Sequence, residues 1–179
     1  MGRRGSSDKF HNKKKELEKK DFKRKVNDRT TVPDLIIACE DSVSSPTYFR
    51  VLVNSLIEEK IVTQDSFVIA GHKHTNPMGV LSDLKNYEDE NGKIYKDFDH
   101  KWIVIDRDRE RVNGGGHSKE EFNNALKNAK NNRSNLNVEV AYSNDCFELW
   151  YLLHFEYRNT AISRDEIVTQ VIKRLQEKE

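Results

Sequence analysis

The sequence predicts an α/β domain in which short buried strands alternate with helices around a central, mainly parallel four-stranded sheet. Apolar runs such as Leu35–Cys39 and Trp102–Ile105 have the length and composition of strands covered on both faces. The segments between such runs carry apolar residues at helical spacing. Because strand and helix patterns alternate along the chain, helices are expected on both faces of the sheet.

The first half of the domain contains two predicted strands, each followed by a helix. Leu35–Cys39 forms the first strand, and Ser45 with Pro46 fits an N-cap and a first helical residue. A second strand follows at Phe67–Ala70, and residues 79–87 form a short helix. The first of these helices has an inner face made of Tyr48, Phe49, Leu52, Val53, Leu56 and Ile57.

The second half repeats the alternation after the third strand, Trp102–Ile105. Ser118 and Glu121 fit a capping box at the start of a helix whose inner residues include Phe122 and Ala125. Alternating apolar residues at 138, 140 and 142 predict a fourth strand. The segment 147–155 is too apolar for a surface helix, and residues 165–177 form an amphipathic one.

Charge divides the 179-residue chain into a basic arm, residues 1–30, and a domain, residues 31–179. The arm has 12 Lys/Arg against 5 Asp/Glu, whereas the remainder has 19 against 25. The arm is interpreted as a solvated or disordered segment, or as a clamp that binds nucleic-acid phosphates by releasing counterions. The basic residues proposed for that contact are Lys13, Lys14, Lys15, Lys19, Lys20, Lys23, Arg24 and Lys25.

Several classes of protein are disfavoured by the sequence. It has no apolar run of about 18 residues, so no membrane span is expected. It also lacks the apolar core of a secretory signal near its N-terminus. Cys39 and Cys146 fit reduced packing residues of a cytoplasmic protein, with a nucleophilic role as the minor alternative.

Acidic residues follow two of the predicted strands. Glu40 ends the first, and Asp106 and Asp108 follow the third. The carboxyl ends of parallel strands share one edge of a sheet, and residues i and i+2 of an extended segment point the same way. Carboxylates gathered there would suit Mg²⁺ or Mn²⁺ and phosphodiester chemistry, with Glu40 as a ligand or a general acid/base. The alternative is that these acids cap helices or remain solvated.

Additional candidates surround these acids. Glu110 is a possible further ligand, and Asn144 follows the fourth strand, where it could bind phosphate or a metal-bound water. Glu148 lies among aromatic residues, so it either faces the site or pairs with a buried Arg or Lys. Gly71–His74 is a candidate metal or phosphate loop, with an exposed surface loop as the alternative.

Several motifs together resemble those of a known family. A strand ending in Glu, followed later by a strand ending in D-x-D, is similar to the TOPRIM arrangement of topoisomerases, primases and OLD-type nucleases. Ile36–Glu40, Thr47–Phe49, Val104–Asp108 and the long segment Tyr142–Phe155 more narrowly resemble the RloB-like family over roughly residues 20–160. The resemblance implies a TOPRIM-like nuclease of prokaryotic anti-phage defence and abortive infection, with an AAA-type or ABC-type ATPase partner. It implies Glu40, Asp106 and Asp108 as the metal-binding and catalytic acids, with Glu148 in the same site.

The chain departs from the family pattern at three places. Asp41 replaces the usual Gly after the glutamate, and it either shifts the metal site or makes it more acidic. Asp145 replaces a common Pro after Asn144, and the family's C-terminal part is expected to be short or truncated. The leading hypothesis is a Mg²⁺-dependent nuclease, and the alternative is a non-catalytic sensor that binds nucleic acid or an ATPase. A D-x-D phosphatase is disfavoured, because such enzymes usually place that motif after the first strand.

Overall fold

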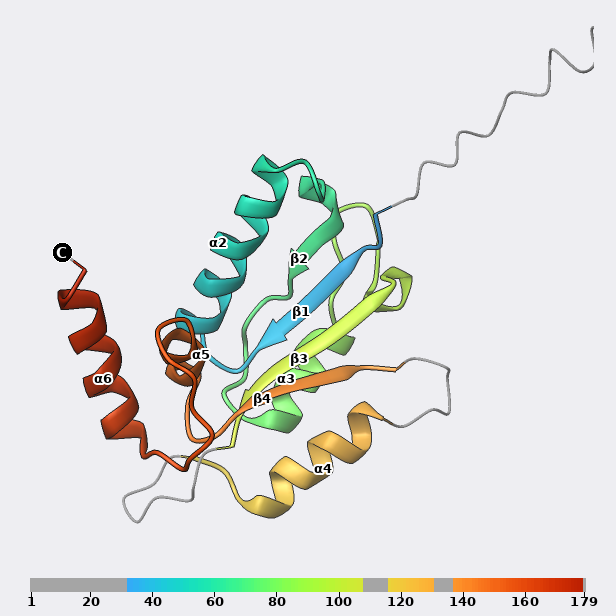
Figure 1. The fold of residues 1–179 in the computed structure, drawn as a ribbon. Helices are drawn as coiled ribbons and strands as arrows, with labels where there is room; N and C mark the ends of the chain where they lie inside the picture. Colours follow the sequence, from blue (N-terminus) through green and yellow to red (C-terminus); the bar gives the residue numbers. More distant parts are fainter. Residues whose placement is uncertain (1–31, 108–115, 131–136, 179) are drawn as a thin grey trace, which may run out of the picture. The chain divides into compact units, whose positions relative to one another are not determined.

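The computed structural model describes residues 32–107, 116–130 and 137–178, which all belong to one compact unit, Val32–Glu179. Four parallel strands form one sheet in the order β2-β1-β3-β4 (Figure 1). This confirms the predicted layered α/β fold with a four-stranded sheet flanked by helices. The strands are β1 (Leu35–Cys39), β2 (Phe67–Ile69), β3 (His100–Asp106) and β4 (Glu139–Ser143).

Helices connect the strands and lie on both faces of the sheet (Figure 1). Because every strand runs in the same direction, their C-terminal ends form one edge, which we call the carboxyl edge. The helices are α2 (Ser44–Glu58), α3 (Pro77–Lys85), α4 (Lys119–Ala129), α5 (Glu148–Leu153) and α6 (Arg164–Gln176), with short 3₁₀ turns η1 (Gln64–Ser66) and η2 (Tyr95–Asp97).

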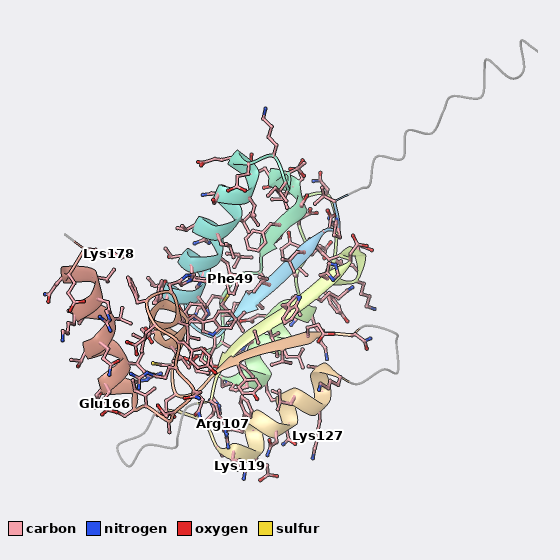
Figure 2. All side chains as sticks on the ribbon, in the orientation of Figure 1. Phe49, Arg107, Lys119, Lys127, Glu166 and Lys178 are labelled. Carbon is pink, nitrogen blue, oxygen red and sulfur yellow. The ribbon has the colours of Figure 1, made fainter. Side chains whose placement is uncertain are left out.

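Alternate residues of the central strands pack into separate cores on the two faces. Ile36 and Ile103 pack on the α3 and α4 side with Leu84 and Phe122. Ile37 and Val104 pack on the other side, against residues of α2 and α5. On that side Phe49 projects from α2 toward the sheet (Figure 2).

Helix α6 packs against α5 rather than against the sheet. Ile167 and Val171 are buried there with Leu152 and Cys146. This contact holds the first residue of α6, Arg164, near the carboxyl edge, where it approaches Asp106.

One local prediction was wrong. Ser45 does not cap α2: the helix begins at Ser44, and the carboxylate of Asp41 accepts hydrogen bonds from its first turn. The side chain of Tyr142 is largely exposed on the edge strand β4, and the ring of Phe122 packs edge-on against it. Within the described ranges, the structure contains no helix that is both long and apolar enough to cross a bilayer.

Candidate functional site

The register of the sheet brings Glu40 and Asp106 together. Cys39 lies opposite Val104, and the Glu40 amide donates to the Val104 carbonyl at 2.9 Å, which extends the ladder by one residue. The Glu40 carboxylate then reaches Asp106 and accepts a hydrogen bond from its backbone N–H at 2.8 Å. The side chains of Glu40 and Asp106 are 13% and 18% exposed. Both carboxylates therefore lie in a partly desolvated position at the carboxyl edge.

Two nitrogen-bearing side chains contact this acidic pair. His117 lies just before α4, is almost fully buried, and places its Nδ1 3.5 Å from the Glu40 carboxylate. Its ring stacks on Phe122 of the same helix. Arg164, at the start of α6, places a guanidinium nitrogen 3.6 Å from the Asp106 carboxylate. The acidic pair therefore has a histidine on one side and an arginine on the other.

Asp41 binds the first turn of α2. Its carboxylate accepts from the backbone N–H of Val43 at 2.9 Å and from that of Ser45 at 3.1 Å, and it also pairs with the Ser45 hydroxyl. A carboxylate at a helix N-terminus satisfies backbone donors and interacts favourably with the helix dipole. The charge of Asp41 thus supports a helix.

Glu148 begins α5 and contacts α2. Its carboxylate accepts from the Ser44 hydroxyl at 3.2 Å, and Tyr151 donates to the Ser44 carbonyl at 2.8 Å. Burial, together with a hydrogen bond to Glu148, raises the pKa of the Cys146 thiol to about 12. Two alternatives were open for Glu148: it faces the site, or it pairs with a buried Arg or Lys. The contacts of the described residues give it no buried Arg or Lys partner.

The end of β4 supplies polar groups to the same edge. Ser143 pairs with Asp106 in the sheet, is buried, and accepts a hydrogen bond from the indole of Trp150 at 3.0 Å. Asn144 follows it with an exposed side chain. Arg107, labelled in Figure 2, continues β3 beyond Asp106 and donates its backbone N–H to the Ser143 carbonyl at 2.7 Å.

Several predicted residues lie outside the part of the chain that the structure describes. These are Asp108, Glu110 and the basic residues between Lys13 and Lys25. Within the described part, no group of three or more His, Cys, Asp or Glu side chains is placed to hold a metal ion. Mg²⁺ commonly binds through one or two carboxylates and completes its shell with water and phosphate oxygens. The partly buried oxygens of Glu40 and Asp106 fit that demand.

The loop after β2 runs past the end of β1 toward α3 (Figure 1). His72 places its Nδ1 3.2 Å from the Cys39 carbonyl, which fixes the loop beside the residue that precedes Glu40. His74 binds the buried carboxylate of Asp83. The Gly71–His74 segment is therefore part of the carboxyl edge.

Three residues of this edge, His117, Arg164 and Asp83, were not among the candidates predicted from the sequence. His117 has a usable signal, because it directly precedes a capping box in the connection after β3, and such connections begin at the carboxyl edge. Arg164 and Asp83 have no comparable local signal. Arg164 reaches Asp106 only through the packing of α6 on α5, and Asp83 resembles any acidic residue of a short helix.

The parallel sheet and the acidic pair at its carboxyl edge define the class of this protein. It is a layered α/β protein with carboxylates at the C-terminal ends of its strands. A family model described as RloB-like protein matches residues 35–179, and the chain belongs to this family. The resemblance noted in its motifs is thereby confirmed. Searches of curated proteins and of solved structures give no match.

Proposed function

We propose that this protein is a Mg²⁺-dependent nuclease that hydrolyses phosphodiester bonds of nucleic acid at the carboxyl edge. The observation that carries the proposal is the contact between Glu40 and Asp106 across neighbouring strands, which brings two carboxylates to one point. Membership of the RloB-like family supports it, because the chain's motifs resemble those of TOPRIM-like nucleases.

In this proposal Glu40 and Asp106 hold the metal, with Asp108 as an expected third ligand. A bound Mg²⁺ or Mn²⁺ ion would neutralise charge on the phosphate and favour attack by water. One oxygen of the Glu40 carboxylate accepts the Asp106 N–H, which limits rotation of the side chain, and the other oxygen lies near His117. His117, which lies just before α4, contacts Glu40 and further restricts that carboxylate.

Arg164 supports binding of an anionic substrate at this edge. Its guanidinium lies 3.6 Å from Asp106 and carries a charge that a phosphate can share. The basic residues from Lys13 to Lys25 would add contacts to the nucleic-acid backbone, offsetting repulsion from the acidic domain. A phosphate at the edge would thus meet cationic groups beside the carboxylates.

The cellular role in this proposal is anti-phage defence in the cytoplasm, together with an AAA-type or ABC-type ATPase. The defence role and the ATPase partner are what the resemblance of the chain's motifs to the RloB-like family implies, and the chain belongs to that family. The cytoplasmic location is supported by Cys39 and Cys146, which are both free and buried, as is usual in a reducing compartment.

The test is cleavage of labelled DNA and RNA oligonucleotides by the purified chain, with Mg²⁺, with Mn²⁺ and with chelator. We expect metal-dependent cleavage that falls by about 100-fold or more with Asp106→Asn, because even indirect partners of metal ligands often change affinity by 10–100-fold. Asp65→Asn is the matched control, since Asp65 is exposed in η1, before β2 at the opposite edge. Equal cleavage by wild type and Asp106→Asn would remove the proposed site.

One observation favours a second function, a non-catalytic module that binds nucleic acid or an ATPase. The Arg164 guanidinium already contacts Asp106, so a cation other than a metal is available to balance that carboxylate. This function requires nucleic-acid or ATPase binding that persists with Asp106→Asn and shows no metal-dependent cleavage. Arg164→Gln separates the two functions: it should tighten Mn²⁺ binding if the carboxylates hold metal, and leave it undetectable if they do not.

A further inference from the structure

A buried carboxylate holds one histidine of the β2–α3 loop in a fixed orientation. Asp83, on α3, has a side chain that is only 3% exposed, whereas that of His74 is 48% exposed. One oxygen of Asp83 lies 2.7 Å from His74 Nδ1. The other accepts the backbone N–H groups of Lys73 at 2.9 Å and of His74 at 3.0 Å. The imidazole and its backbone are thus attached to the same carboxylate.

The protonation of this pair follows from its hydrogen bonds. Burial alone would raise the pKa of Asp83, but the hydrogen bonds from Lys73 and His74 outweigh burial and lower it. Asp83 is therefore ionised near neutral pH and can only accept, so the shared proton belongs to His74 Nδ1. The Nε2 atom is left at the exposed end of the ring, where it can donate a hydrogen bond when it also carries a proton.

Helix α3 leaves room for this histidine. A Cβ atom added at Gly79 would lie 2.3 Å from His74 Cβ and 2.7 Å from His74 Cγ. Gly79 also donates its N–H to the side chain of Asn76, the N-cap of α3, at 2.8 Å. Glycine weakens a helix, so its use here is explained by the close approach of the His74 side chain.

We propose that His74, with protons on both ring nitrogens, donates from Nε2 to a backbone phosphate of nucleic acid at the carboxyl edge, with Asp83 as the residue that positions it. The loop is fixed beside β1 by the contact of His72 with the Cys39 carbonyl, so His74 belongs to the edge that carries Glu40. Lys73, between the two histidines, adds a positive charge. The proposal deepens the proposed function, on which it rests for the identity of the ligand.

The test measures binding of a fluorescent single-stranded oligonucleotide to the full chain in chelator, where cleavage does not interfere. His74→Asn is the informative variant, because its amide can still donate to Asp83 in place of Nδ1 but has nothing in place of Nε2. His100→Asn is the matched control, since His100 is exposed at the first residue of β3, at the opposite edge. Thermal unfolding of each variant confirms that the fold is retained.

We expect His74→Asn to weaken binding about tenfold, as for loss of one charge-assisted hydrogen bond, and to lower the salt slope by about 1. His100→Asn should bind within about twofold of wild type, as usual for a residue away from the contact. Nitrogen-15 spectra should show a proton on His74 Nδ1, and a proton on Nε2 as well when the oligonucleotide is bound, because a phosphate oxygen can only accept. Asp83→Asn should reverse that tautomer, because an amide can donate to Nδ1.

The possible failures are distinct. Wild-type binding that His74→Asn leaves unchanged would overturn the role of His74 while leaving the proposed function intact. An equal loss in His74→Asn and His100→Asn would also overturn it, by showing a general effect of histidine charge. Absence of nucleic-acid binding by the wild-type chain would overturn both proposals.

Discussion

The carboxylate of Glu40 accepts a hydrogen bond from the backbone N–H of Asp106 over 2.8 Å, although the two residues are 66 positions apart in the chain. This contact joins the ends of β1 and β3, which are adjacent in the sheet. It links the structural and the proposed chemical roles of Glu40, because one carboxylate oxygen supports the backbone while the other faces His117.

Substitution of Glu40 should separate these two roles. Glu40→Gln keeps an oxygen that can accept the Asp106 N–H, so we expect stability within about 1 kcal/mol of wild type and cleavage lowered by about 100-fold or more. Urea unfolding and oligonucleotide cleavage measure the two effects. Glu139→Gln, at the exposed start of β4, is the matched control. A fully active Glu40→Gln variant would show that the charge of Glu40 is not used.

Asp41 should matter for stability and little for cleavage. Asp41→Ala removes the acceptor for the first turn of α2, and loss of such a cap costs about 1 kcal/mol. We expect the midpoint of urea unfolding to fall. Metal-dependent cleavage should change by less than about threefold, which corresponds to a free-energy change of under about 1 kcal/mol. A large loss of cleavage with unchanged stability would instead place Asp41 in the site.

The two cysteines should be unreactive in the folded protein. Burial raises the pKa of the Cys39 thiol from 9.0 to about 11, and that of Cys146 to about 12. A rise of two units lowers the thiolate fraction about 100-fold, and a rise of three units lowers it about 1000-fold. Labelling by a thiol reagent near pH 8 should therefore be slower than in the unfolded chain by on the order of 100-fold for Cys39 and 1000-fold for Cys146. Rapid labelling of either cysteine without denaturant would contradict this and revive a nucleophilic role.

Asp83 should make stability depend on pH in the acid range. Its pKa is below the ordinary 3.8 in the folded protein, so the folded state binds this proton less readily than the unfolded chain does. The stabilisation is therefore complete above that value and is lost as pH falls through the folded pKa. The difference in unfolding free energy between wild type and Asp83→Asn should shrink as pH falls from about 6 to about 3. A difference that grows on acidification would contradict the direction.

The sheet and its edge were predictable because both depend on local patterns. Short apolar runs placed the strands, and an acid directly after each of two strands placed Glu40 and Asp106 at one edge. The cap formed by Asp41 was not predictable, because Ser45 beside Pro46 matched a helix start equally well. Contacts of Arg164 with Asp106 and of Asp83 with His74 depend on how helices pack, and no spacing in the sequence encodes that packing.

Binding of Mn²⁺ to the full chain, followed by electron paramagnetic resonance of the free ion, tests the central claim most directly. If Glu40 and Asp106 hold a divalent ion, wild type should remove Mn²⁺ from solution, and Asp106→Asn should weaken that binding by about 10-fold or more. Asp65→Asn should bind as wild type does. Mn²⁺ binding that is equal in wild type and Asp106→Asn, or absent from both, would contradict the account.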